Sequence, residues 1–336
     1  MIKIIQKNSP HLEKNFLSKS IFLNTKWLKV IEKSFNLNCH YVIFKNKQKT
    51  ILPFYEIKLL LKKNFVSIPF SFNINLDKNQ ENYLVQKLCE NRDFFKNFND
   101  VVIKSQFLNY NFSKKDFFKT KYNVYKIKLD KNTYKNFSKN IKKALNKFSL
   151  FNFKIINVYS SKEFDEFYNN YVKSSKKLET FFYPKIFFYN LFKEFNENFT
   201  IVSAYKKNQY LGGHLLLFDK NKNEIIYFLS SKSFEGNNIS IDKILIYKAI
   251  LIAQKKKFQY LNLGRVSRSH EGLNNFKKLF GSEKHEVNYF SLNKRNLSIL
   301  DQQSILKEIV KFFIKYLPLS IYKYINNKLF KYLGIY

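Results

Sequence analysis

The residue types most capable of chemistry gather in one block of the second half of the chain. The block, Leu261–Leu292, reads LNLGRVSRSHEGLNNFKKLFGSEKHEVNYFSL. Gly264 ends a predicted strand, and because glycine has no side chain it lets the backbone turn sharply and a ligand approach closely. Arg265 would project from that strand end and clamp a carboxylate or a phosphate with its planar guanidinium. On the short helix that follows, Phe276 and Phe280 would form an apolar face, and Lys277 would point elsewhere, toward the cleft.

The composition of the chain makes this block informative. Lys and Arg number 60 against 25 Asp and Glu, a formal charge of +35, yet only four of the basic residues are arginine. This profile, with its abundant Asn, Ile, Phe and Tyr, is typical of an AT-biased coding sequence. We therefore attribute part of the charge to a solvated surface and part to partners that carry phosphate or an anionic surface. Six of the seven glycines persist against this bias in one stretch, namely Gly212, Gly213, Gly236, Gly264, Gly272 and Gly281.

Two features of the sequence indicate the compartment of the protein and the kind of membrane contact that it can make. Cys39 and Cys89 are the only cysteines, with neither metal-ligand spacing nor a disulfide framework, which fits a reducing compartment and predicts no metal site. No apolar run approaches the roughly 18 residues of a spanning helix, and the polar start MIKIIQKNSP lacks a signal-peptide core. We therefore expect a cytoplasmic protein whose membrane contact, at the inner face of the cytoplasmic membrane, is peripheral.

The elements that must position the block are expected in two α/β halves. The first half has a helix capped at Asn24 and a hairpin of Tyr41–Lys45 with Thr50–Leu60, and its other elements are expected at 66–68, 80–98 and 100–104. Periodicity in the second half predicts helices at 162–177, 185–195 and 240–257, and strands at 199–205, 210–218, 225–230, 258–263 and 287–292. In both halves the predicted elements follow the same order, which is a helix, several strands, a helix and a strand. The fold class is therefore predicted to be α/β (α+β), with two related modules around mixed sheets flanked by helices.

The order of the predicted elements and the basic segments divide the chain into four predicted parts. These are an N-terminal module at 1–130, a basic helix between the modules at 131–150, a C-terminal module at 151–298 and a basic helical tail at 299–336. In the basic helix, SKNIKKALNK, Lys139 and Lys142 share one face, where they would grip a diphosphate or a nucleic-acid backbone; the alternative is a solvated face. The tail forms two amphipathic helices on either side of Pro318. It can lie in an anionic membrane interface or pack back on the protein.

The block resembles the closing motif of FemAB-like acyltransferases of the GNAT superfamily. In that motif a strand ending in Gly or Gly-Arg precedes Gly-x-x-x-Phe-Lys, then Phe-Gly or Trp-Gly and a last strand. The matching residues are Arg265, Gly272, Phe276, Lys277, Phe280 and Gly281. The resemblance extends to FLNTKWLKVIEKSF, ILPFYEIK, VSIPF, NIKKALNK and FFYPKIFFYNLF, and the tail FFIKYLPLSIYKY is similar to that of relatives from exopolysaccharide or exosortase loci. It implies two tandem GNAT-like modules and transfer of an acyl group to an amine.

The resemblance also implies roles for particular residues. Acyl transfer to an amine needs a neutral amine, a site for the oxyanion and a proton donor, but no covalent enzyme nucleophile. Lys277 is the predicted catalytic cation and Tyr289 a candidate proton donor. Asp242 is either a base or a structural residue, and His214 has no catalytic neighbour in sequence. The predicted substrate-binding residues are Arg265, Gly264, Phe276, Trp27, Lys139 and Lys142.

The donor is expected to be an acyl-CoA or an aminoacyl-tRNA that binds as a co-substrate, with no permanently bound cofactor. Gly236 and Ser240 are the candidate donor-binding residues, because the N-terminus of a helix binds phosphates. No glycine-rich Q/R-x-x-G-x-G/A loop precedes Ser240, which weakens the case for CoA, and SFNINLD after VSIPF departs from the usual paired glycines.

The function that follows is an N-acyltransferase. It would move an acetyl or aminoacyl group to an amine on a cell-envelope precursor or an amino sugar, with no DNA partner. The alternative is a non-catalytic basic protein that binds RNA or a membrane.

Overall fold

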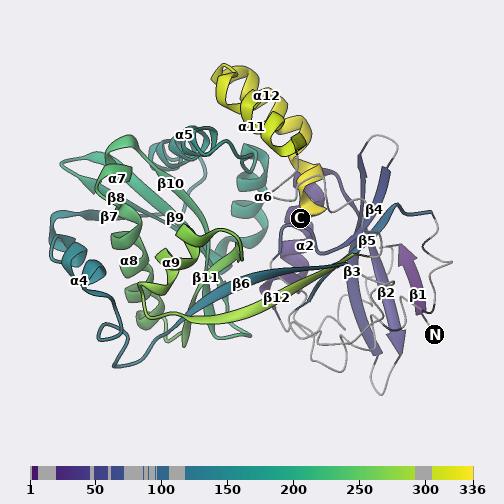
Figure 1. Cartoon of the computed structure of the whole chain (residues 1–336), viewed down its shortest axis with the longest axis horizontal. Coiled ribbons are helices and arrows are strands. Elements are labelled where there is room, and N and C mark those ends of the chain that lie inside the picture. Colours follow the sequence, from purple (N-terminus) through teal and green to yellow (C-terminus); the bar gives the residue numbers. More distant parts are fainter. Residues whose placement is uncertain are drawn as a thin grey trace. The chain divides into compact units, whose positions relative to one another are not determined.

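A computed structural model of the chain forms two compact units (Figure 1). The first comprises Met1–Tyr122, Glu286–Phe313 and Ile325–Tyr336, and the second comprises Asn123–His285 and Ile314–Tyr324. The structure describes residues 2–6, 20–45, 49–59, 62–71, 86, 90, 95, 97–105, 118–291 and 305–335. Most of the helix predicted at 80–98, nearly all of the SFNINLD segment, and Cys89 lie outside these residues. The four-part division of the chain stays a prediction.

The first unit is built on a mixed sheet. Asn24 caps its helix α2 (Thr25–Phe35), with Oδ1 accepting from the Lys26 backbone N at 2.9 Å, as the sequence predicted. The sheet order is β1-β2-β3-β4-β5-β12, in which β4 and β5 are parallel and the other neighbours are antiparallel. The strands are β1 (Ile2–Gln6), β2 (Asn38–Lys45), β3 (Lys49–Leu59), β4 (Lys62–Ser67), β5 (Asp100–Ser105) and β12 (Glu283–Ser291). Both β12 and β6 (Phe118–Lys128) contain a residue at which the chain passes from one unit to the other.

The second unit carries the block singled out in the sequence. Its strand order is β6-β11-β10-β9-β8-β7, and β10 with β11 is a parallel pair. The strands are β7 (Asn152–Ile156), β8 (Phe199–Lys206), β9 (Gln209–Asp219), β10 (Glu224–Lys232) and β11 (Tyr260–Ser267). The helices are α4 (Lys139–Leu145), α5 (Lys162–Lys177), α6 (Lys185–Phe195), α7 (Phe234–Asn238), α8 (Ile241–Lys255) and α9 (Glu271–Lys278).

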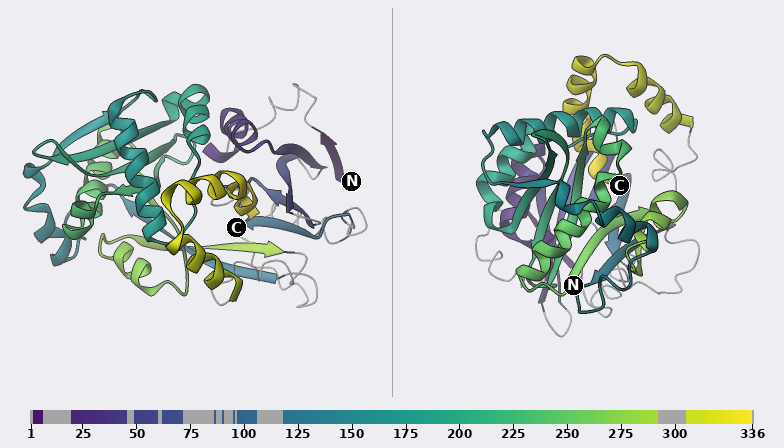
Figure 2. Two further views of the ribbon diagram at one scale, coloured as in Figure 1. Left: turned by 90° about the horizontal axis from the view of Figure 1, so that it is seen from above. Right: turned by 90° about the vertical axis from the view of Figure 1, so that its left-hand side faces the viewer.

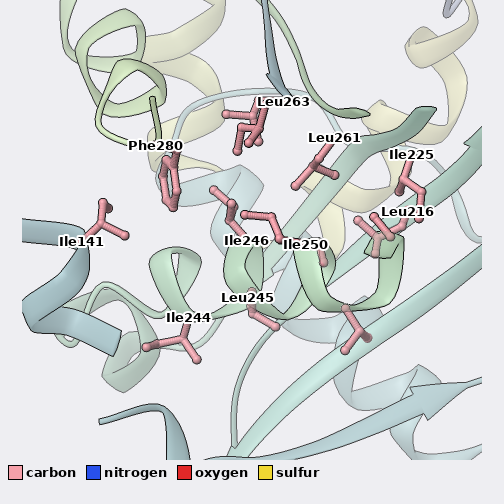
Figure 3. Packing of buried hydrophobic residues seen from close by; sticks show 14 of the residues in the cluster. Ile141, Leu216, Ile225, Ile244, Leu245, Ile246, Ile250, Leu261, Leu263 and Phe280 are labelled. Carbon is pink, nitrogen blue, oxygen red and sulfur yellow. The ribbon is translucent and has the colours of Figure 1, made fainter. Parts of the chain in front are cut away.

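One face of the strands in the second unit carries a large buried apolar cluster (Figure 3). Apolar residues recur around most of α8, so this helix is buried against the sheet and its neighbours. Leu245 and Ile250 of α8 belong to one buried cluster with Leu261 of β11, and Ile141 of α4 and Phe280, just after α9, also belong to it. Each such side chain contributes about 1.5 to 3 kcal/mol by leaving water. The cluster thereby fixes α9, which carries Lys277, against β11.

Two adjacent glycines of β9 show how closely helices cover both faces of this sheet. A Cβ on Gly212 would lie 2.9 Å from Ile241 Cγ2 of α8, and a Cβ on Gly213 would lie 2.8 Å from Phe167 Cδ2 of α5. Because successive residues of a strand point to opposite faces, α8 and α5 cover opposite faces of the sheet. The glycine pair therefore serves helix packing.

Gly281 and Gly272, both part of the family-like motif, are expected to respond differently to alanine. Gly281 has a φ of +65°, and a Cβ there would lie 2.6 Å from Asn136 Cβ, whereas a Cβ on Gly272 meets nothing within 4 Å. Gly281→Ala should lower the free energy of unfolding by about 2 kcal/mol. Gly272→Ala, in α9, should leave it unchanged or raise it by about 0.5 kcal/mol. Urea unfolding of the two variants checks the contrast, and equal losses would contradict it.

The sequence located most elements of the second unit. The helices predicted at 162–177 and 185–195 coincide with α5 and α6, and the predicted strands at 199–205, 210–218 and 225–230 lie within β8, β9 and β10. The predicted end of a strand at Gly264 is wrong, because β11 continues through Gly264 to Ser267. The strands β6 and β7 were not predicted. The mixed α/β fold class is confirmed.

The tail forms two helices, α11 (Ile305–Tyr316) and α12 (Leu319–Leu329), drawn in yellow in Figure 2. They are separated at Pro318, as the sequence predicted. Among the described residues, no helix combines the length and the apolar composition that crossing a membrane requires.

Candidate active site

The candidate site is built on the second half of β11. Gly264 is buried and has a φ of +78°, a conformation that glycine adopts without steric cost. Its backbone N donates to Asn262 Oδ1 at 2.9 Å, so the local turn of the strand is stabilised from within β11. Its carbonyl oxygen accepts a hydrogen bond from Lys277 Nζ at 2.8 Å. Gly264 therefore supplies a backbone acceptor where the sequence had suggested only open space for a ligand.

Lys277 lies inside the second unit, with only 4% of its surface exposed. Besides the bond to Gly264, its Nζ donates to the Arg265 carbonyl oxygen at 3.4 Å. Burial, and then the positive charge of Arg265, lower the pKa of Lys277 from 10.5 to about 7. An amine with this pKa exists near neutral pH in both the protonated and the neutral form. Such strongly shifted groups are concentrated at functional sites.

Asn274 fixes the position of α9 along β11, and with it the position of Lys277. Its Oδ1 accepts from Asn123 Nδ2 and from the Tyr125 hydroxyl, both at 2.9 Å. Its Nδ2 donates to the carbonyl oxygens of Ser267 and His270, both at 2.8 Å. Because every partner is buried or part of the backbone, α9 has little freedom to slide along the sheet. The position of the ammonium follows from this network.

The strand β10 pairs with β11 only up to Asn262, two residues before Gly264. Parallel pairing of β10 with β11 covers only Glu224 to Ile226 on β10, opposite Tyr260 to Asn262 on β11. A register shift between Tyr227 and Leu229 then redirects β10. Both strands are described to their ends, and beyond Asn262 no pairing between them continues. The Lys277 ammonium thus lies where β11 has lost its β10 neighbour.

Two other predicted residues lie beside Lys277. Arg265 follows Gly264 on β11 and is half-buried, and the prediction that it anchors an anionic group stays a prediction. Phe276 is partly buried and packs on the apolar cluster, with its ring centroid 5.5 Å from that of Phe280. In this position Phe276 stabilises α9, and the prediction that it binds substrate stays a prediction.

Tyr289 and Trp27 belong to the first unit, and both are buried. The Tyr289 hydroxyl donates to the Ser71 carbonyl oxygen at 3.4 Å, and the Tyr289 ring lies 4.8 Å from that of Tyr122. Trp27 is 0% exposed and packs edge-on against Phe22 with ring centroids 5.3 Å apart. Neither side chain presents a surface that a substrate could touch in this conformation. Their predicted roles, proton donor and substrate contact, remain untested.

The predicted donor-binding residues lie on α7 and immediately before α8. Gly236, on the short helix α7, is buried, and a Cβ there would lie 1.8 Å from the Leu211 carbonyl oxygen. Its lack of a side chain therefore lets α7 pack directly on the β9 backbone. Ser240 is exposed, adopts the left-handed conformation and makes no side-chain cap to α8.

Asp242, in the first turn of α8, is the centre of a polar cluster that sequence spacing could not reveal. Its Oδ1 lies 3.1 Å from His214 Nε2 and accepts from Ser230 Oγ at 3.0 Å, and its Oδ2 accepts from Lys232 Nζ at 2.7 Å. Burial opposes ionisation of Asp242, but the hydrogen bonds from His214 and Lys232 and the positive charge of Lys232 outweigh it and hold the pKa of Asp242 well below its usual range. Burial lowers the pKa of His214. We infer that His214 is neutral and donates from Nε2 to the carboxylate.

The basic helix α4 lies in the second unit, where Ile141 and Leu145 are buried. Lys139 is exposed. Lys142 Nζ donates to the Lys135 carbonyl oxygen at 2.9 Å and lies 5.7 Å from the centre of the Tyr134 ring. The prediction that Lys139 and Lys142 grip a phosphate-bearing ligand stays a prediction. Among the described residues, no group of three or more His, Cys, Asp and Glu side chains is placed to hold a metal ion.

Comparison with solved structures shows the fold. FemX superposes with a TM-score of 0.58 at 12% identity, over 90% of this chain and 100% of FemX. L-PGS from Bacillus licheniformis gives a TM-score of 0.56 at 13% identity, over 92% of this chain and 98% of L-PGS. The C-terminal domain of a putative lysylphosphatidylglycerol synthetase from Agrobacterium fabrum gives 0.51 at 11% identity, over 72% and 81%. The fold is therefore of the FemX type, as the FemAB-like motif predicted.

Comparison of the sequence gives no family. No family model matches the chain, and no curated protein matches it.

Proposed function

We propose that this protein is an N-acyltransferase that moves an acyl group from an activated donor to an amine on a cell-envelope precursor or an amino sugar. The observation that carries the proposal is the buried Lys277 ammonium, bound to the Gly264 carbonyl where β10 has left β11. The resemblance of this segment to FemAB-like acyltransferases and the likeness of the fold to FemX support it.

The proposed chemistry uses the protonated form of Lys277 as a donor. The acceptor nitrogen bonds to the acyl carbon, the bond from that carbon to the donor's oxygen or sulfur breaks, the amine loses a proton and the leaving group gains one. A lysine with a pKa of about 7 can donate to the developing oxyanion or give a proton to the leaving group. Arg265 would hold an anionic part of a substrate beside it. This scheme uses no proton from Tyr289, whose hydroxyl donates to the Ser71 carbonyl oxygen.

The residues at the start of α8 favour one of the two expected donors over the other. Helix N-termini bind phosphates, but here Asp242 places a carboxylate in the first turn and Lys232 is already bound to it. A diphosphate at this helix end would be repelled by Asp242, and Gly236 is occupied in packing α7. Of the two expected donors, we therefore favour an aminoacyl-tRNA over an acyl-CoA.

Transfer assays with Lys277→Met test the proposed function. Purified protein is given labelled aminoacyl-tRNAs or acetyl-CoA, with amino sugars or extracted envelope precursors as acceptors. The wild type should form a labelled amide, and Lys277→Met should form it about 100-fold more slowly, since one lost contact to the reacting charge typically costs this much. Lys278→Met, an exposed neighbour on α9, is the matched control and should retain the wild-type rate.

The result also separates the alternative of a non-catalytic protein. If the wild type consumes neither kind of donor while it binds RNA with a steep dependence on salt, the enzyme proposal fails and the RNA-binding alternative gains support.

A further inference from the structure

The helical tail presents aromatic side chains to solvent in one turn of α11. Phe312, Phe313 and Tyr316 are 61%, 59% and 64% exposed, and the ring centroids of the two phenylalanines are 6.3 Å apart. Residues three and four apart are neighbours on a helix, so the three rings form one surface. Single exposed apolar residues are ordinary, but a contiguous group marks an interaction site. We call these three residues the α11 aromatic cluster.

The second tail helix continues this exposed character. Ile321 and Tyr324 of α12 are 46% and 66% exposed.

Between Ile314 and Tyr324 the tail belongs to the second unit, where other side chains of the same helices hold it. Ile314 is 4% exposed and Tyr322 is 1% exposed. The Tyr322 ring lies 5.2 Å from that of Phe182, and its hydroxyl donates to the Thr180 carbonyl oxygen. Lys176 Nζ of α5 donates to the Lys315 carbonyl oxygen at 2.8 Å. The tail therefore has a buried face of its own, and the α11 aromatic cluster lies outside that face.

Beyond Glu308, one turn before Phe312, the tail carries charge of a single sign. Residues 309–336 contain no Asp or Glu, and their lysines are Lys311, Lys315, Lys323, Lys328 and Lys331. Lys315 Nζ lies 5.5 Å from the centre of the Tyr316 ring. Aromatic rings beside lysines of this kind suit the boundary between lipid headgroups and acyl chains, where rings enter the apolar layer and ammonium groups pair with anionic headgroups.

We propose that the α11 aromatic cluster docks the protein on an anionic phospholipid bilayer. The uniform positive charge complements an anionic bilayer, which offers negative charge over its whole surface. The rings supply the apolar part of the binding and the lysines supply the salt-sensitive part. Such docking would bring the catalytic unit to acceptors held at a membrane. The inference does not depend on the proposed transfer reaction and is tested without it.

Vesicle flotation tests the proposal on the full chain. The probes are vesicles of phosphatidylcholine alone and vesicles that also contain phosphatidylglycerol, at about 0.05 M and about 0.5 M salt. The wild type should float with the anionic vesicles at low salt. A triple variant, Phe312→Ser, Phe313→Ser and Tyr316→Ser, should lose at least about 10-fold in partitioning. Its fold should be intact, which unchanged circular dichroism and melting temperature would show.

A matched variant controls for the loss of apolar surface in general. Leu178, Ile186 and Tyr189 are 66%, 46% and 43% exposed elsewhere on the second unit. Their triple change to serine should leave flotation at the wild-type level.

Three outcomes would overturn the proposal. These are no flotation of the wild type with anionic vesicles, equal flotation of the α11 triple variant, or an equal loss in the control variant. A wild type that stays off vesicles but sediments as a dimer, which the α11 substitutions dissociate, would assign the cluster to a second copy of this chain.

Discussion

Replacing Lys277 with methionine should remove a pH-dependent part of the protein's stability. The pKa of Lys277 is lowered by burial from 10.5 to about 7 in the folded protein. Below about pH 7 both the folded and the unfolded state hold the proton, and the cost of burying the charge is fully present. Between the two pKa values only the unfolded state holds it, so the free energy of unfolding of the wild type rises with pH. The full rise is at most about 4 to 5 kcal/mol.

The Lys277→Met variant lacks this rise because methionine does not titrate. Its free energy of unfolding should exceed that of the wild type by most at about pH 6, and the difference should fall steadily towards about pH 10. Urea unfolding of both proteins across this range measures the difference, in which the titration of all other groups cancels. Lys278→Met, on the exposed side of α9, should instead follow the wild-type curve. Parallel curves for Lys277→Met and wild type would show that the amine is not buried as described.

Gly236→Ala should destabilise the second unit by about 3 kcal/mol, near the upper end for overpacking. A Cβ at this position would lie 1.8 Å from the Leu211 carbonyl oxygen and 2.7 Å from its carbonyl carbon. Both are backbone atoms of β9, so no side chain can rotate away, and α7 would have to lift from the sheet. Ser233 N donates to the same Leu211 oxygen at 3.0 Å, and that bond would be strained with it.

The measurement for Gly236→Ala is again urea unfolding, with Asn237→Ala as the control. Asn237 is exposed on the same short helix, so its substitution should change the free energy of unfolding by no more than about 0.5 kcal/mol. The result also bears on the predicted donor-binding role. A Gly236→Ala protein of normal stability that had lost donor affinity would favour that role over the packing role.

The Asp242 cluster illustrates what single residues in a sequence do not reveal. His214 and Asp242 are 28 residues apart, on β9 and α8, and each is unremarkable by type. The glycines did carry a signal: Gly212 lies two residues before His214, and it lets α8 approach β9 closely enough for Asp242 to reach the histidine. The close helix could be suspected from the sequence, but its partners could not be identified, because the register of α8 on the sheet is a tertiary property.

The sequence by itself determined the periodic elements of the second unit and the segment that carries its candidate site. Helices such as α5 and α6 follow from apolar residues at helical spacing, a local property, and Lys277 stood out from its place in a motif between scarce glycines. Only the tertiary structure decided what kind of group Lys277 is. Its Nζ donates to the Gly264 and Arg265 carbonyl oxygens of β11, and Asn123 and Tyr125 of β6 hold its helix α9 in place through Asn274. Because desolvation depends on every element around a side chain, a lysine expected as an ordinary cation became a buried amine with a pKa of about 7.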